Sequence, residues 1–129
     1  RVAAVLPDRE VRITAQSVPA GIDRVGADAS SAVAGDGRGA VDVDIAVLDT
    51  GIDAKHRDLN VAGGVNCIQG NNSYLDLNGH GTHVAGIVGA RTNNGVGVAG
   101  INWNVRIMAL KFLGADGSGS TSDAAILAI

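Results

Sequence analysis

The sequence predicts an α/β fold built around a mainly parallel sheet. Two stretches, 41–53 (VDVDIAVLDTGID) and 105–113 (VRIMALKFL), have the apolar, β-branched character of strands. Between them, 80–91 (HGTHVAGIVGAR) has the small and apolar residues of a closely packed helix. Alternating strands and helices are typical of a parallel sheet, and a strand that is apolar on both faces is typical of one covered on both sides. Functional side chains are therefore expected at the carboxyl ends of the strands, where Asp49 lies.

Weaker signals complete the expected order of elements. Residues 1–14 contain a Pro-Asp turn followed by an alternating VRIT, which predicts an edge strand, and 31–40 is rich in turn residues. A weaker strand is expected at 60–67, and loops at 68–79, 93–100 and 114–120. At 120–129, Ser120 and Asp123 precede an apolar run, which predicts the beginning of a helix. That helix has no stop signal, so we expect the chain to be part of a longer protein.

Composition limits the classes of function. The 129 residues are 46% hydrophobic, which predicts a folded chain of at most one domain. A net charge of -3 without a run of Lys or Arg disfavours nucleic-acid binding. No apolar run is long enough to span a membrane. A single cysteine, Cys67, provides neither a disulfide framework nor a thiolate zinc site, and we expect it to be buried.

Three motifs suggest chemistries that their context disfavours. His80 and His83 could form a metal pair, but zincin-type sites place two histidines four apart around a Glu, and this stretch is His-Gly-Thr-His. GVGVAG (95–100) spells a dinucleotide fingerprint, yet a helix-like stretch precedes it and a strand follows, the reverse of the required order. HRDL (56–59) resembles the start of a kinase catalytic loop, but Gly63 occupies the position of its asparagine.

Asp49 and His80 together suggest acid–base chemistry. A carboxylate that accepts a hydrogen bond from imidazole Nδ1–H fixes the tautomer, and that imidazole can then act as a general base toward a hydroxyl nucleophile. The alternative is that Asp49 caps a turn and His80 is a satisfied residue at a helix end. Spacing alone leaves both interpretations open.

Several stretches resemble one family in the same order along the chain. DTGID (49–53) and HGTHVAGIVGA (80–90) resemble the aspartate and histidine boxes of subtilisin-like serine proteases, the subtilases. AQSVPAGIDRV (15–25) resembles the start of the mature domain, and ALKFLGADGSGSTS (109–122) its substrate-binding strand. The resemblance implies a subtilisin-like three-layer fold, truncated after its first half, and a serine endopeptidase.

The resemblance also implies site residues. Asp49 would orient His80, His80 would be the general base, and His83 would be a structural bystander. The substrate-binding residues implied are Leu113, Gly117, Ser118 and Gly119. No stretch matches the family's serine box or its oxyanion asparagine, and Ser118, Ser120 and Ser122 lie in the wrong context. The chain alone is therefore expected to be inactive.

A structural calcium site and a processing site follow from the same resemblance. Oxygen ligands suit Ca²⁺, and those implied come from Gln16, Asp58, Arg91, Asn93, Asn94, Val96 and Val98. The choice between Asn93 and Asn94 stays open. Residues 1–14 would be the end of an inhibitory prodomain, cut at Thr14–Ala15, and 15–129 the amino-terminal part of the catalytic domain.

The implied partners are polypeptide substrates and the protein's own prodomain, for a secreted protein that is monomeric when complete. The competing hypothesis is a non-catalytic module that binds calcium and peptides.

Overall fold

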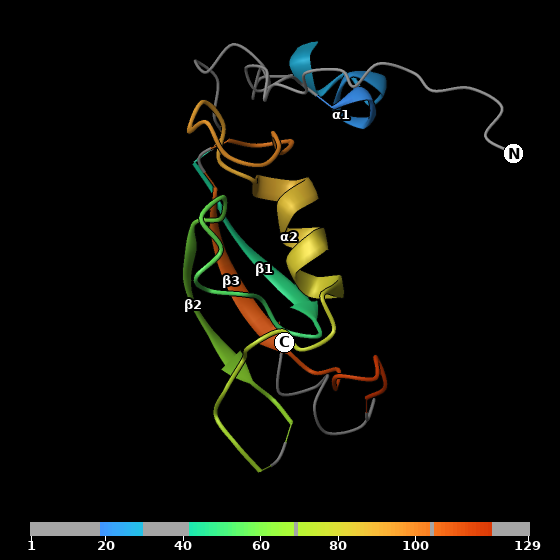
Figure 1. Ribbon diagram of the computed structural model, residues 1–129, viewed down its shortest axis with the longest axis vertical. Coiled ribbons are helices and arrows are strands. Elements are labelled where there is room, and N and C mark those ends of the chain that lie inside the picture. The colour runs from blue at the N-terminus through green and yellow to red at the C-terminus, as the bar shows by residue number, and fades with distance from the viewer. Residues whose placement is uncertain (1–18, 30–41, 69, 104, 120–129) are drawn as a thin grey trace, which may run out of the picture.

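The fold is a three-stranded parallel sheet with a helix on one face (Figure 1). The computed structural model describes residues 19–29, 42–68, 70–103 and 105–119. Its elements are α1 (Ala20–Arg24), a 3₁₀ turn (Ala27–Ala29), β1 (Asp44–Asp49), β2 (Val61–Asn66), α2 (His80–Gly89) and β3 (Arg106–Lys111). The strand order β1-β3-β2 confirms the predicted α/β class and its parallel sheet. The predicted strand at 1–14 and helix at 120–129 lie outside the described residues.

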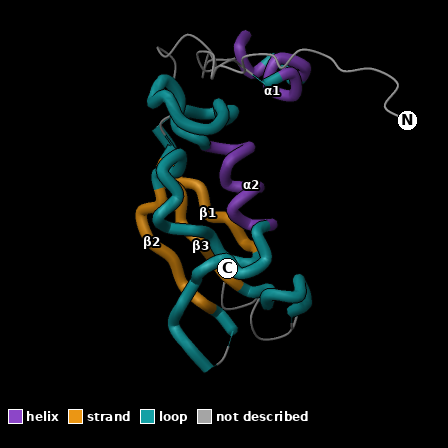
Figure 2. The backbone as a smooth tube through the Cα atoms, viewed as in Figure 1, coloured by secondary structure: helices purple, strands orange, loops and turns teal. Residues whose placement is uncertain are grey.

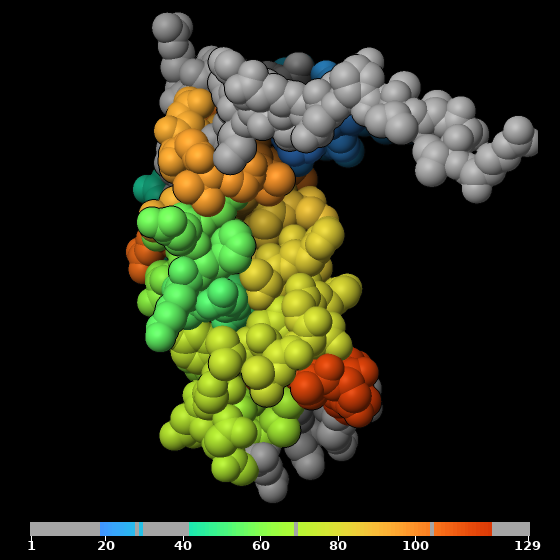
Figure 3. All heavy atoms as spheres, in the orientation of Figure 1, coloured from blue at the N-terminus to red at the C-terminus, as the bar shows by residue number. Residues whose placement is uncertain are grey.

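The sheet brings the carboxyl ends of its strands together. Lys111 at the end of β3 pairs in register with Asp49 of β1 and with Asn66 of β2. Helix α2 begins at this same end, so its first turn faces the end of β1 (Figure 2). The 114–119 segment, which follows β3, lies against the loop that precedes α2 (Figure 3).

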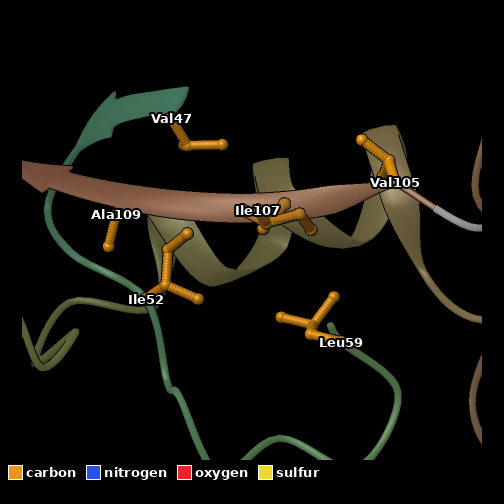
Figure 4. Close-up of a cluster of buried hydrophobic side chains, with 7 residues drawn as sticks. Val47, Ile52, Leu59, Val105, Ile107 and Ala109 are labelled. Carbon is orange, nitrogen blue, oxygen red and sulfur yellow. The ribbon is translucent and has the colours of Figure 1, made fainter. Parts of the chain in front are cut away.

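Aliphatic side chains between α2 and the sheet form the core (Figure 4). The buried cluster consists of Val47, Ile52, Leu59, Ala85, Val105, Ile107 and Ala109. The small residues of α2 permit this close packing, because a Cβ at Gly89 would overlap the Val105 side chain. The chain thus fixes α2 directly on β1 and β3.

The opposite face of the sheet is more open than the apolar strand pattern predicts. Leu48, Val65 and Met108 are 40%, 52% and 43% exposed. These residues share one face, because their strand positions alternate with those packed against α2. Within this chain, α2 covers one face of the sheet, and the other face is partly exposed.

Two smaller clusters complete the packing. Ile22 and Ala27, from α1 and the 3₁₀ turn, pack with Ala99 and Trp103 at the end of the molecule away from the strands' carboxyl ends (Figure 1). Cys67 is buried, as predicted, and it packs against Leu110.

Within the part of the chain that the structure describes, no helix combines the length and apolar character needed to cross a membrane.

Candidate active site

Asp49 and His80 meet at the carboxyl end of β1. His80 Nδ1 lies 2.7 Å from Asp49 Oδ1 and 2.8 Å from Oδ2. Because a carboxylate only accepts, Nδ1–H donates and the other ring nitrogen, Nε2, is left as the basic atom. The Asp49 side chain is 11% exposed and that of His80 is 64% exposed. The carboxylate is thus enclosed, and the imidazole is reachable from outside.

The backbone around β1 holds Asp49 in place. Its carbonyl oxygen accepts hydrogen bonds from the backbone N–H groups of Phe112 (3.0 Å) and Leu113 (3.3 Å), and its Oδ1 accepts one from Thr50 N–H (2.7 Å). Lys111, which is 6% exposed, donates a hydrogen bond from Nζ to the Thr50 carbonyl oxygen. The end of β1 is therefore tied to β3 through main-chain and side-chain contacts.

The first turn of α2 positions His80. Gly79 precedes the helix in the left-handed region (φ 97°), a conformation that favours glycine. Gly79 supplies no side-chain cap. Instead, Thr82 N–H at the start of α2 donates to Asp76 Oδ2 at 2.9 Å, and Thr82 Oγ1 donates to the same oxygen at 2.6 Å.

Asp76 was not singled out from the sequence. Partial burial raises the pKa of Asp76, but hydrogen bonds from Thr82, Gly79 and Thr50 outweigh it and hold the pKa well below its ordinary value. The carboxylate is therefore ionised, and it lies at the helix N-terminus, where negative charge is favoured. The available signal was an acidic residue just before Asn-Gly and the start of a helix.

A second enclosed carboxylate, Asp58, lies under the loop that follows α2. Asp58 is 1% exposed. Its Oδ1 accepts from Asn94 Nδ2 and its Oδ2 from Val98 N–H, both at 2.8 Å, and its carbonyl oxygen accepts from Arg91 N–H at 2.7 Å. The left-handed Gly97 (φ 58°) lets the loop close, because a Cβ there would overlap Asp58 Oδ2.

Residues 114–118 form a turn after β3. Gly114 N–H donates to the Ser118 carbonyl at 2.7 Å, and Gly117 has φ 79°. Hydrogen bonds from Ser118 N–H and Oγ lower the pKa of the exposed Asp116. Asn78 Nδ2 donates to the Ala115 carbonyl at 2.9 Å, which places this turn beside the start of α2.

Comparison with known proteins identifies the family. Residues 41–128 match the model of the subtilase family, including both segments that supply the Asp49–His80 pair. This chain belongs to the subtilase family. The resemblance noted from the sequence boxes is therefore confirmed.

The curated relatives of this subtilase include proteins named as proteases, subtilisins and an elastase. An alkaline protease of Alkalihalobacillus alcalophilus is 48% identical over 124 residues, which are 96% of this chain and 31% of the relative. Subtilisin Savinase of Lederbergia lenta is 50% identical over 111 residues, 86% of this chain and 39% of the relative. Alkaline elastase YaB of Bacillus sp. (strain YaB) is 46% identical over 121 residues, 94% and 30% respectively. The chain thus spans about a third of the length of these relatives.

The predicted site residues other than Asp49 lie at several different places in the structure. His83 is exposed one turn along α2, and its N–H donates to the Gly79 carbonyl. His80 directs Nδ1 to Asp49, and no group of three His, Cys, Asp or Glu suited to a metal occurs among the described residues. Asn94 contacts Asp58 through its side chain. Gln16 lies outside the described residues.

Proposed function

We propose that the full-length protein is a subtilisin-like serine endopeptidase, with Asp49 and His80 as two members of its catalytic triad. The observation that carries the proposal is the contact of both Asp49 oxygens with His80 Nδ1, at 2.7 and 2.8 Å. The family supports the same reaction, because its relatives are named as proteases and subtilisins. The nucleophilic serine and the oxyanion asparagine would come from the part of the full-length protein outside this chain.

The geometry suits general acid–base catalysis by His80. His80 Nε2 takes the proton of the serine hydroxyl as the serine oxygen attacks the peptide carbonyl carbon. The same proton then passes to the leaving amine, the peptide C–N bond breaks, and an acyl-enzyme remains. Water then attacks the ester carbonyl carbon as Nε2 accepts its proton. The bond between the serine oxygen and the acyl carbon breaks, the carboxylic acid leaves, and the serine oxygen takes the proton from Nε2. Asp49 stays ionised and stabilises the imidazolium in each step.

The 113–119 segment would bind the substrate on one side of the pair. Leu113 would form an apolar wall, and the backbone of Gly117, Ser118 and Gly119 would pair with an extended peptide. The hydrogen bond from Asn78 to the Ala115 carbonyl supports this role, because it ties the segment to the helix that carries His80.

A structural calcium ion would bind at Asp58, and the residues present fit it. The Asp58 carboxyl group is 1% exposed, and it accepts hydrogen bonds from two neutral donors, the Asn94 side-chain amide and the Val98 backbone N–H. A bound cation would supply the positive charge that a buried carboxylate needs as a partner. The ligands would be Asp58, Asn94, Gln16 and backbone carbonyls of Arg91, Val96 and Val98, with oxygen donors suited to Ca²⁺. Bound calcium would clamp the 91–98 loop onto the body of the domain.

The remaining proposals concern processing and location. Residues 1–14 would be the end of an inhibitory prodomain, released by a cut at Thr14–Ala15, and 15–129 the first part of the catalytic domain. The protein would be secreted and monomeric, with polypeptides and its own prodomain as partners. The relatives named as alkaline proteases support polypeptides as the substrates.

A fluorophosphonate probe tests the proposed activity, because it reacts with a serine activated by a neighbouring histidine. The full-length protein should be labelled, and this 129-residue chain should not. His80→Ala should abolish labelling, whereas the matched His83→Ala, three residues along the same helix, should retain it. Absence of labelling in the full-length protein would favour a non-catalytic module that binds calcium and peptides. Labelling of His80→Ala would assign the base to another residue.

A further inference from the structure

Asp76 connects the two elements that supply the candidate pair. Its Oδ1 accepts hydrogen bonds from Thr50 Oγ1 (2.9 Å), next to the end of β1, and from the N–H groups of Asn78 (3.0 Å) and Gly79 (2.8 Å). Its Oδ2 accepts from both N–H and Oγ1 of Thr82, in the first turn of α2. The Asp76 carboxylate is therefore hydrogen-bonded to the residue after β1, to the loop that precedes α2 and to the first turn of α2.

Thr50 continues this connection to the reacting pair. Thr50 N–H donates to Asp49 Oδ1 at 2.7 Å, and Thr50 Oγ1 accepts from Gly81 N–H at 3.0 Å. Gly81 directly follows His80. Hydrogen bonds thus connect Asp76 to Thr50 and Thr50 to Asp49 Oδ1, which is 2.7 Å from His80 Nδ1. A further hydrogen bond connects Thr50 to Gly81 in α2.

We infer that Asp76 is a positioning residue for the proposed hydrolysis: it fixes the separation of Asp49 and His80 without touching the reacting atoms. This inference rests on the proposed endopeptidase function. Its physical basis is that two side chains from different elements keep hydrogen-bond geometry when packing and supporting hydrogen bonds hold both elements in place. The five hydrogen bonds to the Asp76 carboxylate provide that support.

Replacing Asp76 by asparagine should loosen the start of α2 but leave the contacts to Thr50, Asn78 and Gly79 in place. An amide keeps one acceptor oxygen, which can retain the three donors now on Oδ1. The amide nitrogen would then face Thr82, whose hydroxyl can rotate to accept but whose backbone N–H cannot. That N–H loses its partner at the first turn of α2, so the helix can shift and carry His80 away from Asp49.

The experiment compares variants of the full-length protein. Asp76→Asn and Thr82→Val remove contacts to the start of α2, whereas Thr82→Ser keeps the hydroxyl, and Asp23→Asn is a charge-matched control on the distant α1. The measurements are kcat, KM and the rate of fluorophosphonate labelling, well below each variant's thermal midpoint. We expect kcat and the labelling rate to fall by up to about 100-fold in Asp76→Asn and by less in Thr82→Val, with KM nearly unchanged. Thr82→Ser and Asp23→Asn should match the wild type.

The outcomes separate this inference from the proposed function. If the wild-type protein neither hydrolyses peptides nor labels, the proposed function is wrong and the inference falls with it. If the wild type is active, and Asp76→Asn and Thr82→Val lower only the thermal midpoint, Asp76 is structural and the inference alone is wrong. A rise in KM without a fall in kcat would also overturn it, because Asp76 would then act on substrate binding. Thr82 Oγ1 also accepts a hydrogen bond from Asp53 N–H at 3.0 Å, so Thr82→Val removes that contact together with the one to Asp76. Should Asp76→Asn fail to fold, the Thr82→Val and Thr82→Ser pair tests the role of this hydroxyl in joining Asp76, the start of α2 and the chain after β1.

Discussion

Adding one methyl group at Gly81 should separate Asp49 from His80. A Cβ at Gly81 would overlap the backbone oxygen of Gly51 and would lie 3.1 Å from Asp49 Cβ. A backbone oxygen cannot rotate away, so α2 must move off the end of β1. Overpacking of this kind costs about 1–3 kcal/mol, and alanine regains about 1 kcal/mol of helix propensity. The net loss in the free energy of unfolding is therefore about 0–2 kcal/mol.

The expected effect of Gly81→Ala on catalysis is larger than its effect on stability. The His80–Asp49 contact is 2.7 Å, and lengthening it by about 1 Å would exceed hydrogen-bond range. Such a displacement lowers the rate by about 100-fold. The assay is kcat for a peptide substrate, together with the thermal midpoint, in the full-length protein.

Gly86→Ala is the matched control, because it makes the same change in the same helix with no atom within 4 Å of the new Cβ. This variant should gain up to about 1 kcal/mol of stability and keep its kcat. Equal kcat values for the Gly81 and Gly86 variants would refute the argument from close packing.

Three further predictions follow from buried and ionised groups in the described residues. Because the folded pKa of Asp76 lies below its unfolded value, its carboxylate stabilises the fold above about pH 4, and this stability is lost as the pH falls further. The difference in thermal midpoint between wild type and Asp76→Asn should thus be constant near neutral pH and shrink below about pH 4. Chelation of calcium should lower the thermal midpoint of the wild type but not of Asp58→Asn; an equal fall in both would remove the proposed ion from Asp58. Ile107→Ala, at a fully buried core position, should cost about 2–5 kcal/mol in denaturant unfolding, and Ile107→Val only about 0.5–1.5 kcal/mol.

The local elements were predictable because their signals are local. The apolar stretch before Asp49, the small-residue stretch after His80 and the apolar stretch before Leu113 predicted β1, α2 and β3. The short helix α1 was not predicted, since its five residues are too few for a periodic pattern. The apolar strand pattern does not reveal which face of the sheet α2 covers, because the pattern is the same for both faces.

The contacts that shape the candidate site were not predictable from any local pattern. Asp76 and Thr50 are 26 positions apart in the sequence, and Asn94 and Asp58 are 36 apart. A hydrogen bond at such separation depends on how the elements pack, not on spacing along the chain. The sequence therefore left the choice between Asn93 and Asn94 open and did not identify Asp76.

By itself, the sequence determined the α/β class, the family resemblance and the residue types at the ends of two elements: a carboxylate at the end of a strand and an imidazole at the start of a helix. The tertiary structure decided that Asp49 and His80, which are 31 positions apart, meet at 2.7 Å. It did so because parallel strands place their carboxyl ends on one edge, Gly81 lets α2 approach that edge, and the Asp76 carboxylate hydrogen-bonds to both sides. Residue chemistry is encoded locally, but the separation of two side chains is a property of the packed fold.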